Sequence, residues 1–255
     1  DCAISNDEDK GISPSNPSGA AGSLATWDTN AFEFKGWYLV IGEEKSLLTT
    51  DAQLSPSEIM QHYLGGRLTS SECVAIFQEK MATITYTSET GGSIDTTTET
   101  VRMKTQDQAT GSKATADPRY KFAGWWAGGS EASQDETFSP TRPTTGYWAD
   151  ITYTAKFNEE NTNITYQVYT DDEESTYGGS TTPTAETVAS VTGTAAGSTA
   201  TPSQGYMIKG WYKINESGQA EEVIREGVPF TGALLKPDHA DFGKEYFEPE
   251  VTYRV

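Results

Sequence analysis

The chain has 255 residues, of which 37 are acidic and 18 are Lys or Arg, and its formal net charge is −19. This charge argues against a nucleic-acid partner, because the phosphate backbone favours Lys and Arg. It is more typical of a soluble surface whose like charges repel one another. No run of about 18 apolar residues occurs, so no segment is predicted to insert into a membrane.

The composition favours several small domains over one large core. Hydrophobic residues make up 35% of the chain and aromatic residues 11%, which suits two or three small β-domains whose aromatic side chains supply most of the burial. The chain begins with Asp, and no charged-then-apolar leader precedes it. We therefore expect a processed protein or a piece of a longer one.

A short aromatic motif recurs three times at nearly equal spacing. It reads "FEFKGWY", "YKFAGWW" and "YMIKGWY", with its glycine at Gly36, Gly124 and Gly210. Self-similarity at a fixed period is the signature of a tandem array. The predicted domains are repeat one at 1–79, repeat two at 80–159 and repeat three at 160–255.

Repeats two and three also align upstream of this motif. "GGSIDTTTETV" at 91–101 matches "GGSTTPTAETV" at 178–188, and an alternating Ile-Thr-Tyr segment precedes each. Such alternation is typical of a half-buried strand, and Gly-Gly of a turn. Each repeat is therefore predicted to open with a hairpin. In repeat one this hairpin is shortened or partly missing.

A second alignment predicts the closing strand of each repeat. "ITYTAKF" lies over "CVAIF" when Phe157 is placed on Phe77, and "EVTYRV" closes repeat three. Six polar or small residues follow each of these phenylalanines before Ile-Thr-Tyr returns. We therefore expect short loops to link the repeats, with boundaries near Glu79 and Glu160.

The Gly-Trp motif is predicted to form the core strand of each repeat. Alternation along a strand places Tyr120, Phe122 and Gly124 on one face, and Ala123 and Trp125 on the other. Glycine within a strand marks a bulge or a close approach, which can turn the neighbouring indole into the core. The alternative is an exposed aromatic platform for sugar, but a motif present once per repeat is more often a core signature. The predicted core residues are Phe34, Gly36, Trp37, Phe122, Gly124, Trp125, Ile208, Gly210 and Trp211.

The segments that follow each Gly-Trp strand differ among the repeats. In repeat one a helix is predicted over 56–64, with Ser55 as N-cap, Pro56 at the first helical position and Glu58 completing a capping box. Prolines in the corresponding segment of repeat two argue against that helix, and Trp148 is expected to be exposed there. Repeat three is expected to form a short helical turn and a loop.

No catalytic or metal centre is predicted. The two histidines, His62 and His239, lie in different repeats, and no phosphate loop, nucleophile elbow or zinc motif occurs. The acidic stretches at 5–11 and 171–175 are candidates for Ca²⁺, but neither has the ligand spacing of an EF-hand, which favours solvated loops. We therefore expect no enzyme activity, no cofactor and no metal.

The Gly-Trp motif, the upstream strand with its Gly-Gly turn and the "TYTAKF" ending together resemble the Listeria–Bacteroides repeat, also called the internalin B-repeat. The resemblance covers repeat two almost end to end, repeat three with a longer tail, and repeat one from about Gly22. It implies a mainly β chain with short helices (α+β), a tandem array of three small β-grasp-like domains. Long loops after each Trp depart from the family pattern.

The same resemblance implies a function and a location. Such modules are strung along bacterial surface proteins, so we expect a non-catalytic, extracellular stalk or spacer of an adhesin at the bacterial cell surface. Its partners would then be other domains of a longer surface protein. The alternative is a ligand-binding adhesin module that recognises a host protein or glycan through the loops after each Gly-Trp strand.

The resemblance also implies a disulfide between Cys2 and Cys73. In a β-grasp module the first and last strands lie side by side, and "CAIS" and "CVAIF" would be those strands. Adjacent strands are about 4.8 Å apart, which is close to the Cα separation that a disulfide needs. The alternative is two free thiols, with Cys2 at a frayed end and Cys73 buried as a small hydrophobic residue.

Overall fold

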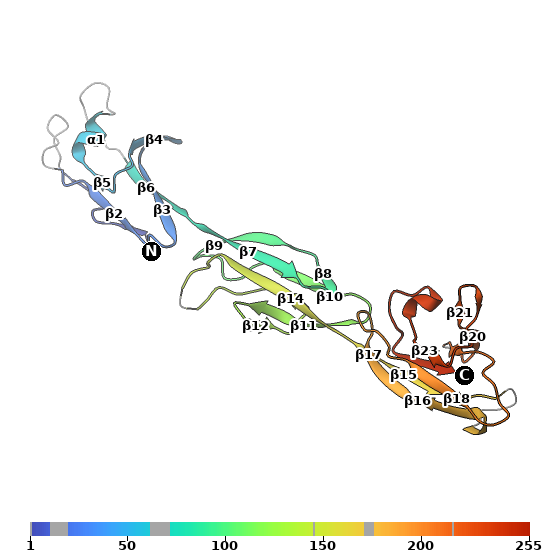
Figure 1. Cartoon of the computed structure of the whole chain (residues 1–255). Coiled ribbons are helices and arrows are strands. Elements are labelled where there is room, and N and C mark those ends of the chain that lie inside the picture. Colours follow the sequence, from blue (N-terminus) through green and yellow to red (C-terminus); the bar gives the residue numbers. More distant parts are fainter. Residues whose placement is uncertain (1, 11–19, 62–71, 145, 171–175, 216) are drawn as a thin grey trace. The chain divides into compact units, whose positions relative to one another are not determined.

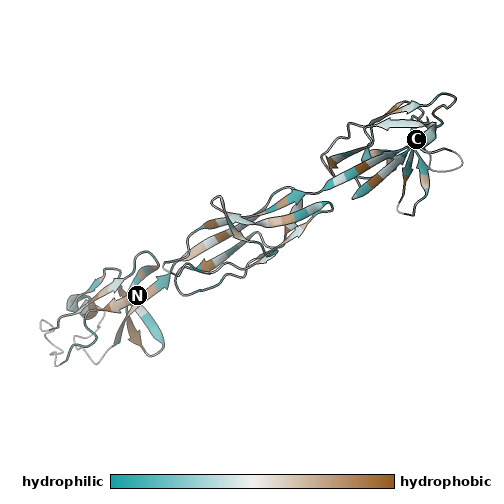
Figure 2. Ribbon diagram, turned by 90° about the horizontal axis from the view of Figure 1, so that it is seen from below, coloured by the Kyte–Doolittle hydropathy of each residue, from teal (hydrophilic) through white to brown (hydrophobic). Residues whose placement is uncertain are grey.

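The computed structural model describes residues 2–10, 20–61, 72–144, 146–170, 176–215 and 217–255. This part of the chain is mainly β, with short helical elements, as predicted (Figure 1). Every sheet among these residues takes its strands from a single predicted repeat. Hydrophobic residues lie mainly on the strands (Figure 2).

Contacts between Cα atoms divide the chain into two compact units. The first consists of Asp1–Tyr86, Thr96–Ser112 and Phe138–Tyr153, and the second of Thr87–Asp95, Lys113–Thr137 and Thr154–Val255. The division runs through repeat two. The residues that join repeats one and two therefore lie within the first unit, and those that join repeats two and three lie within the second.

Repeat one forms two small sheets, with the orders β1-β2-β5 and β4-β3-β6. Its elements are β1 (Cys2–Ile4), β2 (Ser23–Trp27), β3 (Phe32–Ile41), β4 (Glu44–Thr49), β5 (Gln53–Leu54), α1 (Pro56–Gln61) and β6 (Glu72–Glu79).

Repeat two forms a five-stranded sheet, β12-β11-β14-β7-β9, and a three-stranded sheet, β13-β10-β8. Its strands are β7 (Met81–Ser88), β8 (Gly92–Ile94), β9 (Thr98–Arg102), β10 (Ser112–Ala116), β11 (Tyr120–Ala127), β12 (Ser130–Ser133), β13 (Thr137–Phe138) and β14 (Ile151–Glu159).

Repeat three has the same order in its two main sheets, β17-β15-β24-β19-β20 and β16-β18-β23, and adds the pair β21-β22. Its elements are β15 (Asn161–Gln167), η2 (Thr176–Gly178), β16 (Gly179–Thr182), β17 (Ala185–Ala189), β18 (Ser198–Pro202), β19 (Tyr212–Ile214), β20 (Ala220–Glu222), β21 (Ile224–Arg225), β22 (Val228–Pro229), β23 (Leu234–Leu235), η3 (His239–Phe242) and β24 (Glu250–Arg254). The predicted helical turn is η3.

The predicted opening hairpin is wrong in its pairing. The strand after the Gly-Gly turn, β8, pairs with β10, whereas β7 pairs with β9. In repeat three, likewise, β16 pairs with β18, and β15 pairs with β17. The turn therefore carries the chain from one sheet to the other. The local alternation that predicts each strand does not specify its partner.

The glycines of the motif form the predicted bulge in repeats one and two. Gly36 and Gly124 have φ angles of 127° and 120°, values that favour glycine. The register skips one residue there, since Phe122 lies opposite Phe157 while Gly124 lies opposite Lys156. The prediction that Phe122 and Trp125 lie on opposite faces of the strand was wrong. The extra residue brings the two side chains to the same face, where their ring centroids are 6.3 Å apart.

The three motif tryptophans are buried, as predicted. Trp37, Trp125 and Trp211 have relative exposures of 1%, 0% and 0%. Each indole N–H donates to a backbone carbonyl of the following segment, at Ala52 (3.0 Å), Glu136 (3.2 Å) and Gly232 (2.9 Å). Gly36, Gly124 and Gly210 are also buried, whereas Phe34, Phe122 and Ile208 are half-buried against the same cores. The motif therefore organises the core of every repeat.

The closing strands keep the predicted register. Phe77 pairs with Phe34, and Phe157 pairs with Phe122. Their ring centroids are 5.3 Å and 5.8 Å apart. The alignment of the two phenylalanines is therefore confirmed.

The helix of repeat one begins where predicted. Glu58 Oε2 accepts from the Ser55 backbone N–H (2.8 Å) and from the Ser55 hydroxyl (2.9 Å). The helix spans Pro56–Gln61, and the rest of the predicted 56–64 range lies outside the described residues. The equivalent segment of repeat two contains prolines, and the described residues of that segment contain no helix.

The expectation that Trp148 is exposed was wrong. Its relative exposure is 2%, its backbone N–H donates to Met103 O (2.9 Å) and its indole N–H to Gln106 O (2.6 Å). The surrounding segment has little regular structure, but its backbone folds over repeat two and brings the indole inside. An irregular segment can thus bury a large aromatic side chain.

The predicted disulfide was also wrong, since both cysteines are free. Cys2 lies on β1, which pairs with β2, whereas Cys73 on β6 pairs with Leu39 of β3. The pairing of β1 with β2 corresponds to that of β8 with β10, so β1 is the counterpart of β8, not of a first strand. The described residues of repeat one contain no counterpart of β7.

We predict that replacing Trp148 is as damaging as replacing Trp125. Trp125→Ala and Trp148→Ala should each lower the free energy of unfolding of repeat two by ~3–5 kcal/mol, the usual loss for a buried large aromatic side chain. Trp126→Ala is the control, because Trp126 is half-buried beneath Lys156 Nζ, 4.8 Å from its ring centroid. Urea unfolding followed through repeat-two amide resonances measures each loss. A Trp148→Ala loss as small as that of the control would contradict the buried position.

We also predict that denatured, unreduced protein shows two reactive thiols per chain. In the native protein Cys2, which is exposed, should react first. Cys73 should react more slowly, because burial, with a smaller contribution from the Glu72 charge, raises the pKa of its thiol and the thiolate is the reactive form. Stopped-flow titration with a chromogenic thiol reagent resolves the two rates. Equal rates, or no reactive thiol, would contradict this assignment.

Candidate functional site: the junctions between repeats

One residue separates the strands of neighbouring repeats at both junctions. β6 ends at Glu79 and β7 begins at Met81, and β14 ends at Glu159 and β15 begins at Asn161. The expected six-residue linking loops were therefore wrong. Strand pairing continues to the last residue, with Glu79 opposite Phe32 and Glu159 opposite Tyr120, and leaves little chain for a loop.

The last residue of each closing strand is a glutamate that binds the next repeat, and we call Glu79 and Glu159 the junction glutamates. Glu79 Oε1 accepts from the backbone N–H groups of Lys104 (2.6 Å) and Thr105 (2.7 Å), and its Oε2 accepts from the Thr105 hydroxyl (2.6 Å). These donors follow β9, the strand that borders β7. One carboxylate therefore receives three hydrogen bonds.

Glu159 repeats this arrangement at the second junction. Its Oε1 accepts from the backbone N–H groups of Val191 (2.5 Å) and Thr192 (2.8 Å), and its Oε2 from the Thr192 hydroxyl (2.8 Å). The loop that donates follows β17, the counterpart of β9. Donor types, acceptor atoms and the threonine are the same at both junctions. Hydrogen bonds to an ionised carboxylate are stronger than those between neutral groups.

The residue between the two strands adds backbone hydrogen bonds in both directions. At the first junction the Lys80 N–H donates to Ala31 O (2.8 Å), and Lys80 O accepts from the Met103 N–H (3.0 Å). At the second, the Glu160 N–H donates to Arg119 O (2.8 Å), and Glu160 O accepts from the Ser190 N–H (2.9 Å). This residue therefore connects a turn of one repeat to a loop of the next.

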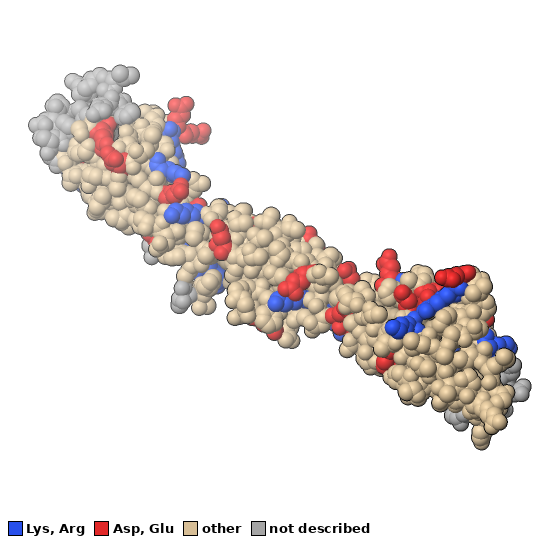
Figure 3. Space-filling model, viewed as in Figure 1, with Lys and Arg blue, Asp and Glu red and all other residues tan. Residues whose placement is uncertain are grey.

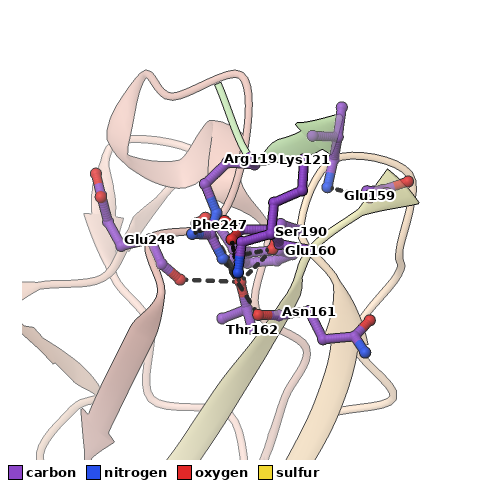
Figure 4. Close-up of polar contacts among 10 residues, drawn as sticks. Arg119, Lys121, Glu159, Glu160, Asn161, Thr162, Ser190, Phe247 and Glu248 are labelled. Atoms are coloured by element: carbon purple, nitrogen blue, oxygen red, sulfur yellow. Dashed lines mark hydrogen bonds and ion pairs between the residues drawn. The ribbon is translucent and has the colours of Figure 1, made fainter. Parts of the chain in front are cut away.

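Arg119 forms a further network at the second junction (Figure 4). Its guanidinium donates to Glu160 Oε2 and Ser190 Oγ, each at 2.8 Å, and to Asn161 O at 3.2 Å. Lys121 Nζ lies 2.8 Å from the other oxygen of Glu160. Arg119 lies in the connection between β10 and β11 and has a positive φ of 69°.

Two buried hydroxyls support this network from the side of repeat three. Thr162 and Ser190 are fully buried, and their hydroxyl oxygens lie 2.8 Å apart. The Thr162 hydroxyl also lies 2.9 Å from Glu248 O. Buried polar groups need such partners, because burial without them is costly. These hydrogen bonds therefore hold in place the Ser190 hydroxyl to which the Arg119 guanidinium donates.

The first junction carries different side chains in the equivalent turn. Asp28 accepts a hydrogen bond from the Tyr147 hydroxyl and lies 3.9 Å from Lys104 Nζ. The Tyr147 hydrogen bond lowers the pKa of Asp28. Lys80 Nζ also donates to Thr29 O (2.7 Å). The backbone contacts and the junction glutamate are thus shared, while the surrounding charges differ.

The junction contacts change the acidity of the carboxylates. Burial alone would raise the pKa of Glu79 and of Glu159, but the three hydrogen bonds to each outweigh it and lower the pKa. For Glu160, the hydrogen bond from Lys121 is the main cause of a lowered pKa, with the charges of Lys121 and Arg119 adding to it. All three groups are therefore ionised at neutral pH.

A second glutamate pattern repeats within repeats two and three. Glu99 accepts from the Tyr86 hydroxyl (2.7 Å) and from the Thr110 and Gly111 N–H groups (2.8 and 2.9 Å). The same contacts occur in repeat three, where Glu186 accepts from the hydroxyl of Tyr166 (2.5 Å). Burial is the main reason that the pKa of Tyr86 is raised, and the hydrogen bond to Glu99 and the charge of Glu99 raise it further. This pattern belongs to the "ETV" that the two repeats share, and it stabilises each repeat internally.

Sequence reasoning placed one boundary at the junction glutamate Glu79 and the other at Glu160, one residue after the junction glutamate Glu159. The signal was present, because a glutamate follows Phe77 and Phe157 at the same distance and a threonine occurs at 105 and 192. Without the strand register, however, these glutamates look like members of a polar linker. The donors lie more than 20 residues away in sequence, so no local pattern connects them.

The other candidate groups form no metal site among the described residues. The described residues contain no group of three His, Cys, Asp or Glu residues that could hold a metal ion. The Asp9 carboxylate accepts from the backbone of Ala21 and Gly22, and His239 packs against Phe247 with centroids 5.3 Å apart. His62 and the acidic stretch 171–175 lie outside the described residues.

Comparison with known protein families, with curated proteins and with solved structures finds no match to this chain. Among the described residues, no helix is long and apolar enough to cross a membrane.

We predict that Glu159→Gln weakens the second junction. The amide keeps one carbonyl oxygen but loses the charge and the second acceptor, so the loss should be ~1.5–3 kcal/mol, the range for hydrogen bonds to charged groups. Hydrogen exchange of the Val191 and Thr192 amides, which donate to Glu159, measures it directly. Glu131→Gln is the matched control, because Glu131 is exposed on β12. Equal exchange in both variants would show that the junction carboxylate contributes nothing.

We further predict that stability falls in acid because the junction glutamates protonate. A lowered native pKa means that the unfolded chain binds more protons, so the free energy of unfolding decreases as pH falls. The contribution is complete above the ordinary glutamate pKa of about 4.3 and is lost as pH falls through the lower native pKa. Urea unfolding between pH 7 and pH 3 should show a shallower pH dependence for Glu79→Gln/Glu159→Gln. A slope identical to that of the unmodified chain would contradict the assignment.

Proposed function

We propose that this chain is a non-catalytic, extracellular repeat segment of a bacterial cell-surface protein and acts as the spacer of an adhesin. The observation that carries the proposal is the repetition of the junction glutamate with the same three donors at both junctions. A spacer must control how each repeat follows the previous one. Contacts repeated from junction to junction meet that requirement, whereas a flexible linker does not.

The shortness of the junctions supports this proposal. A single residue separates two hydrogen-bonded strands, and its own N–H and C=O groups are engaged on both sides. Rotation at that residue would break these bonds together with those to the junction glutamate. We therefore propose that bending between neighbouring repeats is restricted.

Surface charge also suits an exposed spacer. On the face shown in Figure 3, most of the described surface is uncharged, and several Lys and Arg side chains lie beside Asp or Glu. The net charge of −19 opposes association between copies through like-charge repulsion. Other domains of a longer surface protein would be the partners of such a segment.

The sheet order supports a β-grasp-like assignment as part of the same proposal. In repeat three the first strand, β15, pairs in parallel with the last strand, β24. The sheets of repeat two follow the same order of strands. First and last strands that lie side by side are what the resemblance to the Listeria–Bacteroides repeat implies for each module.

A ligand-binding adhesin module is the second candidate, and variation among the repeats favours it. The segment after the Gly-Trp strand contains α1 in repeat one, an irregular proline-containing chain in repeat two, and β20–β23 with η3 in repeat three. Variable loops on a shared scaffold are a common way to carry binding sites. A glycan array and a pull-down from host proteins, both with the whole chain, test this candidate.

We predict that a flexible insertion at the junction changes the solution behaviour of the chain. Four Gly or Ser residues inserted after Glu159 should broaden the distribution of dimensions measured by small-angle X-ray scattering, because they uncouple the junction contacts. The control is the same insertion between Gly128 and Gly129, an exposed turn in which an added Cβ meets nothing within 4 Å. Indistinguishable scattering from the two insertions would contradict the spacer proposal.

A further inference from the structure

The first and last strands of repeat two are neighbours that run in the same direction. β7 and β14 are adjacent in their sheet. The Thr83 N–H donates to Asp150 Oδ1 (2.7 Å), and the Thr87 and Thr154 hydroxyl oxygens lie 2.8 Å apart. Both contacts join residues that are 67 positions apart, so residue numbers rise together along the two strands. We call β7 and β14 the parallel pair.

Contacts join the parallel pair on both faces of the sheet. On the core side Tyr86 and Tyr153 are buried, and their rings stack with centroids 6.0 Å apart. Thr87 lies on the opposite, exposed side. Just past the end of β7, the Glu89 N–H donates to Ala155 O (2.9 Å). Sliding one strand past the other would break all of these contacts.

Repeat three has the same arrangement. β15 pairs in parallel with β24 through five successive residue pairs. In one of these pairs the rings of Tyr166 and Tyr253 stack with centroids 6.2 Å apart. A stacked tyrosine pair between parallel first and last strands is therefore common to both repeats.

The chain enters and leaves repeat two at opposite ends of the parallel pair. The first junction leads into the start of β7 at Met81, and the second junction follows the end of β14 at Glu159. Tension along the chain therefore pulls the two strands past each other, and it acts on all contacts between them at once. β14 is also paired with β11 on its other side, so its movement would break those hydrogen bonds as well.

We propose that the parallel pair is a mechanical clamp, through which repeat two transmits tension without unfolding. This proposal rests on the proposed spacer function, because force on an adhesin passes through each repeat of its spacer in turn. Forced unfolding is governed by the rate at which the unfolding barrier is crossed. Contacts that must break together give a higher barrier than contacts that break one after another.

The test pulls on repeat two within the whole chain, through pairs of introduced cysteines that carry the handles of optical tweezers. Four exposed residues lie near the ends of the two strands: Met81 and Ser88 on β7, Ala149 before β14 and Asn158 near its end. Met81→Cys/Asn158→Cys and Ser88→Cys/Ala149→Cys place the handles at opposite ends of the parallel pair. Met81→Cys/Ala149→Cys and Ser88→Cys/Asn158→Cys place both handles at the same end, where force separates the strands contact by contact.

The four variants control one another. Each cysteine substitution occurs once with handles at opposite ends and once with handles at the same end, so its own effect on stability is common to both geometries. All four variants also carry Cys2→Ser and Cys73→Ala, because both native cysteines are free and would otherwise bind handles. One loading rate is used throughout.

We expect both opposite-end variants to unfold at about twice the force of the same-end variants or more, because force then meets the higher barrier. Equal forces in the two geometries, or a larger force for the same-end variants, would overturn the proposal.

Failure of the clamp and failure of the spacer are distinguishable. The scattering comparison of the insertion after Glu159 applies no force and reports only on bending at the junction. Equal unfolding forces with broadened scattering would remove the clamp and leave the spacer. Unchanged scattering with a large force difference would remove the spacer and leave the mechanical resistance of the parallel pair.

Discussion

The single residue between the last strand of one repeat and the first strand of the next is the constraint on which both junctions depend. Because β14 remains paired with β11 up to Glu159, this side chain leaves the sheet from a defined position. Its carboxylate then reaches two backbone N–H groups and a hydroxyl in the loop after β17. A longer linker would leave the same groups free to separate.

Much of the core could be predicted from the sequence because it depends on local patterns. The Gly-Trp motif identified Trp37, Trp125 and Trp211, which are all buried. The pairing of closing and core strands followed from aligning Phe157 with Phe77. Both successes have one physical reason: a small domain has few large aromatic side chains, and those of the repeated motif supply much of its buried apolar surface.

The failures concern contacts between segments that are distant in sequence. Alternation placed Phe122 and Trp125 on opposite faces, but the bulge that β11 forms in its pairing with the distant strand β14 brings their rings together. Trp148 lies in an irregular segment, which local propensity treats as exposed, yet its burial depends on the whole repeat. Cys2 was assigned to a first strand through the family resemblance, because no local pattern shows that β1 pairs with β2. The donors to Glu159 were missed for the same reason, since they lie in another repeat.

¹⁵N relaxation of the whole chain measures whether repeats two and three tumble together. It compares the rotational correlation times of β11 in repeat two with those of β17 in repeat three. The junction contacts predict the same value for both groups of amides, and different values in Glu159→Ala/Arg119→Ala, which removes the side chains that bind across the second junction. Different values in the unmodified chain would mean that the two repeats move independently and that the junction contacts do not hold them together.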